Sequence, residues 1–144
     1  MFVARRQPVS IADCRLIEFP ITSDPRGNLT VIEGAQHIPF EIARIFYLDV
    51  VPAGATRAGH ANRRSDQVLV ALAGSFEVTV DDGDLRASTT LNRSSHGYFL
   101  PHMIWRELAH FSSGAICLAL ASEPFDENDY HRDYEEYVRA VTGR

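Results

Sequence analysis

Short apolar runs separated by closely spaced turn signals are the feature of this sequence that most limits its fold. The runs are rich in Val, Ile, Phe, Tyr and Thr and cover residues 45–51, 68–73, 76–80, 85–91 and 115–121. Between them lie clusters of Gly, Pro, Asp and Ser that are typical of turns, at 24–27, 52–54, 81–83, 94–97 and 112–114. Many short strands at this spacing predict an all-β sandwich or barrel.

The run at 76–80 shows the period of a strand most clearly. Its side chains alternate between apolar and polar, as in a strand with one face turned to water. Asp82-Gly83 follows directly and predicts a hairpin turn into the run at 85–91.

The C-terminal segment has a different period and predicts a helix over 126–141. Acidic residues that suit a helix N-terminus lie near its start, at Asp126, Glu127 and Asp129. Side chains at helical spacing follow, namely Tyr130, Tyr134, Tyr137, Val138 and Val141. We expect the tyrosines to pack against the sheet. Because no linker or repeat interrupts the chain, residues 1–144 are expected to form a single domain closed by this helix.

Composition excludes several classes of function. The 14 basic residues are all Arg, and without Lys there is neither Schiff-base catalysis nor a Walker-type phosphate loop. A formal net charge of −5 argues against a protein that coats nucleic acid. Two cysteines without metal spacing favour a reducing compartment, and no signal-length or membrane-length apolar run is present. A soluble cytoplasmic protein is therefore expected.

The residues that carry chemistry follow the turn at 52–54. Gly54, His60, Asn62, Gln67 and Gly74 have the spacing of the first cupin motif, G-x5-H-x-H-x3-4-E-x6-G, and the chain resembles that superfamily here. In a strand, residues two apart face the same side, so His60 and Asn62 should point together into the barrel. Gln67 should approach them from the adjacent strand.

The expected fold is therefore a cupin, a jelly-roll β-barrel with a C-terminal helix. Metal-binding cupins use three His and one Glu, and the resemblance places Asn62, Gln67 and Arg106 at three of those four positions. A guanidinium repels a cation, and amide oxygens are poor ligands for a transition metal. We predict a site with no metal and no other cofactor. The remaining imidazole, His60, has the chemistry of a general base beside a carbonyl.

Most of the chain resembles one cupin family more closely, the sugar-nucleotide 3,4-ketoisomerases that act on TDP-4-keto-6-deoxyglucose. The matching stretches include 24–29, 37–40, 44–47, 81–83, 111–113 and 126–130. The resemblance implies a metal-independent isomerase of deoxysugar biosynthesis that forms a homodimer, with N-terminal strands packed across it. It also implies a reaction in which a His removes the C3 proton, an enediol forms, and a proton returns at C4.

The resemblance assigns roles to individual side chains. His60 is the expected base. Tyr47 is expected to donate a hydrogen bond to the enediolate or to move the hydroxyl proton. Asn62 replaces the second His of the family pattern and is expected to hold a hydroxyl or ketone oxygen, since an amide does not shuttle protons. The expected substrate-binding side chains are Arg26, Arg44, Arg57, Gln67, Ser75, Trp105 and Arg106.

The arginines in this set suit a nucleotide pyrophosphate. We expect a small-molecule nucleotide-sugar partner, no nucleic acid and no membrane. Two alternatives stay open: a sugar-nucleotide 3,5-epimerase, and a non-catalytic cupin that binds a sugar nucleotide. Asn62 is the residue that keeps the second alternative open.

Overall fold

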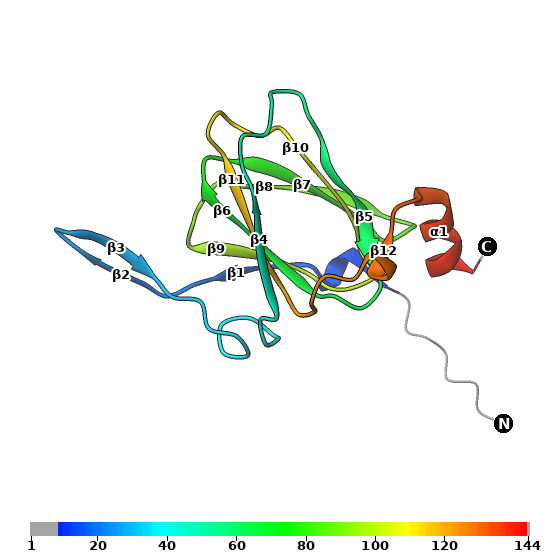
Figure 1. Ribbon diagram of the computed structural model, residues 1–144, viewed down its shortest axis with the longest axis horizontal. Coiled ribbons are helices and arrows are strands. Elements are labelled where there is room, and N and C mark those ends of the chain that lie inside the picture. Colours follow the sequence, from blue (N-terminus) through cyan, green and yellow to red (C-terminus); the bar gives the residue numbers. More distant parts are fainter. Residues whose placement is uncertain (1–8, 144) are drawn as a thin grey trace.

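Two antiparallel five-stranded sheets face each other in this computed structural model, which describes residues 9–143 (Figure 1). The strand orders are β1-β9-β6-β11-β4 and β12-β5-β10-β7-β8, and β2 and β3 form a separate hairpin. The predicted all-β cupin fold with a C-terminal helix is confirmed. Residues 1–8, where the sequence predicts no signal peptide, and residue 144 lie outside the described residues, so the expected boundaries 1–144 stay a prediction.

The strands are β1 (Arg15–Glu18), β2 (Ile21–Asp24), β3 (Gly27–Thr30), β4 (Arg44–Leu48), β5 (Arg57–Asn62), β6 (Gln67–Ala73), β7 (Phe76–Asp81), β8 (Arg86–Leu91), β9 (His96–Leu100), β10 (Trp105–Ala109), β11 (Ile116–Ala121) and β12 (Tyr130–His131). The helical elements are η1 (Ile11–Asp13), η2 (Glu127–Asp129) and α1 (Tyr134–Thr142). No helix between residues 9 and 143 is long and apolar enough to cross a bilayer.

The alternating strands build the core between the sheets. In β7, Phe76, Val78 and Val80 are buried, whereas Glu77 and Thr79 between them are partly exposed, as the period of two predicts. The Asp82-Gly83 turn then joins β7 to β8. The Asp82 carboxylate accepts the backbone N–H groups of Asp84 and Leu85 at 2.9 and 2.8 Å, and Gly83 adopts a φ of 91° that favours glycine.

Each sheet is also covered on its outer face. The segment 31–43 brings Ile38 and Phe40 against the β6 side chains Val68 and Val70. Helix α1 covers the other sheet, where Tyr137 is fully buried against Trp105. The Tyr137 hydroxyl lies 2.7 Å from the Met103 carbonyl oxygen, which fixes the helix to the loop before β10.

The C-terminal helix is shorter than predicted, because it begins at Tyr134 and not near Asp126. The Asp126 side chain accepts the Asn128 N–H and caps the short turn η2. Tyr130 then pairs with Asn62 of β5 as a strand, and the Asp133 side chain accepts the Glu136 N–H at 2.9 Å to start α1. Pairing with β5 gives the backbone of residues 130–131 hydrogen-bond partners. These residues therefore form a strand, although their side chains have helical spacing. The packing role therefore holds for Tyr137, whereas Tyr130 lies on β12 beside the site described next.

Candidate active site

A cavity of about 250 Å³ opens between the two sheets. Its polar lining comes mainly from β5, β6, β10 and the segment around β12: Arg57, His60, Gln67, Arg106, Tyr130 and Arg132. Its apolar lining consists of Phe46, Leu48, Ala58, Leu69, Leu108 and Cys117. An apolar enclosure with a few convergent polar groups is the usual form of a small-molecule site.

A β-bulge in β5 aims His60 into this cavity. Arg106 of β10 pairs with His60 and Glu107 pairs with Ala58, so Gly59 is the extra residue. Gly59 has a φ of 68°, a left-handed conformation that a residue without Cβ adopts readily. The bulge puts His60 directly opposite Arg106 on neighbouring strands, and both side chains line the cavity.

The environment keeps the His60 imidazole neutral. The pKa of His60 is lowered from 6.5 to about 3, chiefly by burial and also by the positive charges of Arg106 and Arg132, against opposing contributions from the Ala58 backbone and the Asn62 side chain. A neutral imidazole has one nitrogen free to accept a proton, which is the form that a general base requires.

We predict that His60 stays unprotonated well below pH 6 in the folded protein. The unfolded chain takes up this proton near pH 6.5, whereas the folded chain takes it up near pH 3, so folding becomes less favourable as the pH falls through that window. Between pH 7 and 4.5, this proton should cost the unaltered protein about 2 kcal/mol of its unfolding free energy. The His60→Gln variant should not show that part of the loss. Denaturant unfolding at both pH values and an NMR titration of the His60 ring check this, and a His60 pKa near 6.5 would contradict it.

The Arg106–Gln67 pair lies across the cavity from one sheet to the other. Arg106 is 1% exposed, its Nη1 donates to Gln67 Oε1 at 2.9 Å, and its Nε donates to the Ile104 carbonyl at 3.1 Å. Because Oε1 of Gln67 accepts from the guanidinium, its Nε2 is the group left over. Arg106 Nη2 and Gln67 Nε2 are both buried without a hydrogen-bond partner in the described part of the chain. Two unused donors on cavity-lining side chains suit an oxygen of a bound ligand.

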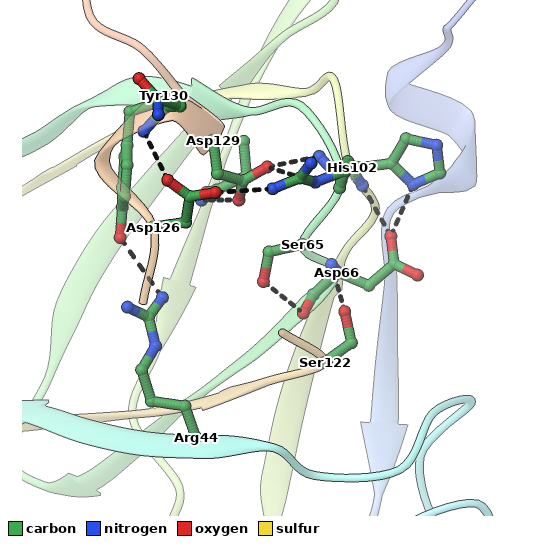
Figure 2. Close-up of polar contacts among 11 residues, drawn as sticks. Arg44, Ser65, Asp66, His102, Ser122, Asp126, Asp129 and Tyr130 are labelled. Carbon is green, nitrogen blue, oxygen red and sulfur yellow. Dashed lines mark hydrogen bonds and ion pairs between the residues drawn. The ribbon is translucent and has the colours of Figure 1, made fainter. Parts of the chain in front are cut away.

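Tyr130 and Arg132 complete the lining of the cavity, and Arg44 contacts Tyr130. The Tyr130 ring packs edge-on against the His60 ring, with 4.9 Å between the ring centroids. Its hydroxyl accepts a hydrogen bond from Arg44 Nη2 at 3.3 Å, as Figure 2 shows. The Arg132 guanidinium carbon lies 4.4 Å from the centroid of the Tyr130 ring. Sequence reasoning missed Tyr130 and Arg132 because both fell within the expected helix.

Two of the expected site residues lie away from the cavity of their own chain. Tyr47 is 64% exposed, because it points outward from β4 while its neighbours Phe46 and Leu48 point inward. Arg26 lies at the tip of the projecting β2–β3 hairpin, where it pairs with Asp24 at 2.7 Å (Figure 1). Neighbouring side chains of a strand, such as Phe46 and Tyr47, face opposite sides, and the sequence alone does not tell which side is inside.

Three further expected site residues have structural contacts instead of a place in the cavity lining. Trp105 is buried on the outer side of its sheet, where its ring centroid lies 5.2 Å from that of Tyr134. Ser75 lies in the turn after β6, and its N–H donates to Ser112 Oγ at 2.9 Å. Asn62 is fully buried next to the cavity, and its Nδ2 donates to an Asp129 carboxylate oxygen at 3.1 Å. None of the three lines this cavity, so the expected contacts of Trp105, Ser75 and Asn62 with a ligand stay predictions.

The expected absence of a metal rests on the chemistry of the side chains present. The positions in question hold Asn62, Gln67 and a buried Arg106, and burial lowers the pKa of Arg106 only to about 10, so it stays cationic at neutral pH. Within residues 9–143, no three His, Cys, Asp or Glu side chains lie close enough together to hold a metal ion. Metal analysis of the purified protein tests the expectation.

One family of known proteins matches most of the chain. The family described as "FdtA: WxcM-like, C-terminal" matches residues 12–142. The TDP-4-oxo-6-deoxy-alpha-D-glucose-3,4-oxoisomerase of Aneurinibacillus thermoaerophilus is 35% identical over 127 residues, which are 88% of this chain and 91% of that protein.

Two solved structures are similar throughout. A 3,4-ketoisomerase from Helicobacter canadensis is 40% identical, with a TM-score of 0.88 over 90% of this chain and 98% of that one. A sugar 3,4-ketoisomerase from Thermoanaerobacterium thermosaccharolyticum in complex with TDP is 36% identical, with a TM-score of 0.90 over 94% and 98%. The resemblance seen in the sequence is thereby confirmed, and the chain belongs to the FdtA (WxcM-like, C-terminal) family, whose members similar to it include sugar-nucleotide 3,4-ketoisomerases.

Proposed function

We propose that this protein is a TDP-4-keto-6-deoxyhexose 3,4-ketoisomerase, an intramolecular oxidoreductase of deoxysugar biosynthesis. The observation that carries the proposal is a neutral His60 directly opposite Arg106 in one cavity, where Arg106 and Gln67 each keep a donor unused. The activity of the similar proteins and the nucleotide bound to one of them support the proposal.

The reaction removes a proton from C3, adds a proton at C4 and moves the hydroxyl proton from O3 to O4. The C4 ketone acidifies the hydrogen on C3, and His60 takes that proton as the C3–H bond breaks. The electron pair forms a C3–C4 double bond and leaves negative charge on O4. A proton then passes from O3 to O4 and another is delivered to C4, which leaves a ketone at C3. Atoms and electrons balance without an external oxidant, so the chemistry needs no redox cofactor.

Arg106 and Gln67 have the geometry to stabilise the enediolate. The unpartnered Nη2 of Arg106 and Nε2 of Gln67 are donors held in a buried site. Donors that are fixed before the reaction stabilise a developing oxyanion more than water does, because they need no reorganisation. In this proposal both amino groups donate to the sugar oxygens at C3 and C4.

Arginines in and beside the cavity are positioned to bind the diphosphate of the nucleotide. Arg57 and Arg132 line the cavity, and Arg44 lies beside Tyr130. Guanidinium groups bind phosphate oxygens in pairs of parallel hydrogen bonds. A bound diphosphate also offsets part of the positive charge that lowers the pKa of His60, so substrate binding makes His60 a stronger base.

In this proposal Tyr130 moves the hydroxyl proton, a role that the family resemblance suggested for Tyr47. Tyr130→Phe should lower kcat by roughly 10- to 100-fold, because the ring and its packing remain while the hydroxyl is lost. Tyr47→Phe is the matched control, and it should change kcat less than about twofold, since removal of an exposed surface group is usually nearly neutral. Steady-state kinetics on both variants decide between the two tyrosines. A large loss confined to Tyr47→Phe would contradict the assignment.

Product analysis in deuterated water tests the function itself. Incubation with TDP-4-keto-6-deoxyglucose should give a 3-keto product that carries deuterium at C4, identified by NMR. Exchange at C5 as well as C3 would select the 3,5-epimerase alternative. Tight binding of the nucleotide sugar without exchange at C3 would select the non-catalytic alternative.

The expected homodimer and cytoplasmic location belong to the same proposal. The projecting hairpin exposes one apolar side chain on each face, Ile21 and Leu29, which are 48% and 60% accessible. A second copy of this chain packed on the hairpin accounts for them. The molar mass in solution tests this assembly.

A further inference from the structure

Two cavity-lining side chains depend on a segment that has little structure of its own. We call residues 126–132 the C-terminal strap; it contains η2 and β12 and carries Tyr130 and Arg132 to the cavity. Only Tyr130 and His131 pair with β5, opposite Asn62 and Ala61. A two-residue strand is short, so further hydrogen bonds outside this pairing are needed to hold the strap in place.

Asp129 is the buried residue of the strap, with 3% exposure. Its carboxylate accepts the Asn62 Nδ2–H at 3.1 Å and the Arg64 backbone N–H at 2.7 Å, and its own carbonyl accepts the Arg63 N–H at 2.6 Å. Hydrogen bonds to a buried carboxylate are stronger than bonds between neutral groups. These three bonds tie the strap to β5 and to the turn after it, as Figure 2 shows in part around Asp129.

The residue after Asp129 is the one that touches the expected base. The Tyr130 ring lies between His60, at 4.9 Å between centroids, and the Arg132 guanidinium, at 4.4 Å. The strap therefore decides how far the Tyr130 hydroxyl and the Arg132 charge lie from His60. A misplacement of about 1 Å in such a site can cost roughly 100-fold in rate.

We infer that Asp129 is a positioning residue which, through its hydrogen bond with Asn62, sets Tyr130 and Arg132 against His60. The inference rests on the proposed function for its catalytic consequence. It also gives Asn62 a role that needs no proton transfer. The Asn62 amide donates to Asp129 at every pH at which the carboxylate is charged, whereas an imidazole at this position would change charge near neutrality.

NMR of the His60 ring tests the positioning without reference to activity. In protein with ¹³C-labelled His, the edge-on Tyr130 ring shifts the His60 Cε1–H signal, and Tyr130→Leu calibrates the position of that signal without the ring. Asp129→Ala and Asn62→Ala should each move the signal toward the Tyr130→Leu value. Asp82→Ala is the matched control, because Asp82 is also a buried carboxylate that accepts backbone N–H groups, at Ile11, Asp84 and Leu85. It should leave the signal in place.

Kinetics supply the second measurement. Asp129→Ala and Asn62→Ala should each lower kcat by roughly 10- to 100-fold, and the double variant should be no slower than the slower single variant, because both break the same bond. An unmoved His60 signal in Asp129→Ala overturns the inference, as does a kcat loss that multiplies in the double variant. If Asp129→Ala does not fold, Asp129→Asn replaces it. That variant keeps an acceptor for the Arg64 N–H and forces the Asn62 amide to rotate, so the signal should move in the same direction but less.

The two proposals fail separately. Absence of ketoisomerase activity in the unaltered protein overturns the proposed function, and the NMR result for the strap still stands. If the unaltered protein is active but Asp129→Ala leaves the His60 signal unmoved, the positioning role alone is overturned.

Discussion

His60→Gln should lower kcat by roughly 10²- to 10⁴-fold and abolish the incorporation of solvent deuterium at C4. The magnitude is that of a general base removed from a proton transfer. Gln fills most of the imidazole volume and keeps a hydrogen-bonding group, so KM should change little. The measurement is the initial rate together with the deuterium content of the product by NMR.

His110→Gln is the matched control for this experiment. His110 is exposed in the loop after β10 and does not line the cavity, so the variant should retain its rate within about twofold. Equal rates for the His60 and His110 variants would show that the base lies elsewhere, and the mechanism proposed above would then be wrong.

Arg106→Met is expected to have the second largest effect, a loss of roughly 10²- to 10³-fold in kcat. Met has a similar length and no donor, so the enediolate loses the Nη2 contact. The same change removes a positive charge that lowers the pKa of His60, and the pKa of His60 should therefore rise above about 3. Kinetics and an NMR titration of His60 measure the two effects.

Stability separates this catalytic role from a structural one. Within residues 9–143, Arg106 has no ion pair with a carboxylate, although it is 1% exposed. Replacing a buried charge with an apolar side chain of similar volume is often neutral or stabilising. We expect Arg106→Met to lose activity while keeping or raising its free energy of unfolding. Arg93→Met, at an exposed arginine, should change neither quantity. Loss of activity in proportion to loss of stability in Arg106→Met would contradict the assignment.

Local patterns predicted most of the fold because the alternation of apolar and polar residues identifies a strand from the sequence alone. Phe76, Val78 and Val80 are buried where alternation predicts, and Gly83 makes the expected turn. The helix over 126–141 was placed about two turns too early. Its tyrosines have helical spacing, yet Asp126 and Asp133 each cap a separate element. Tyr130 and His131, which lie between these caps, pair with β5 as a strand.

The candidate site was predicted where one motif carried it. His60, Gln67 and Arg106 meet in the cavity as the cupin spacing implies, and Arg57 joins them. The motif does not place Trp105. Neighbouring side chains lie on opposite faces of β10, so Arg106 faces the cavity and Trp105 faces α1.

By itself, the sequence determined the strand periods, the spacing that brings His60 opposite Arg106, and the membership of the chain in its family. Only the tertiary structure decided which face of each strand is inside, and hence that Tyr130 and not Tyr47 meets His60. It also decided that Asn62 binds Asp129, 67 residues away in the chain. The physical reason is that a strand has two equivalent faces until other strands cover one of them. Contacts between distant segments depend on that choice, and no local pattern encodes it.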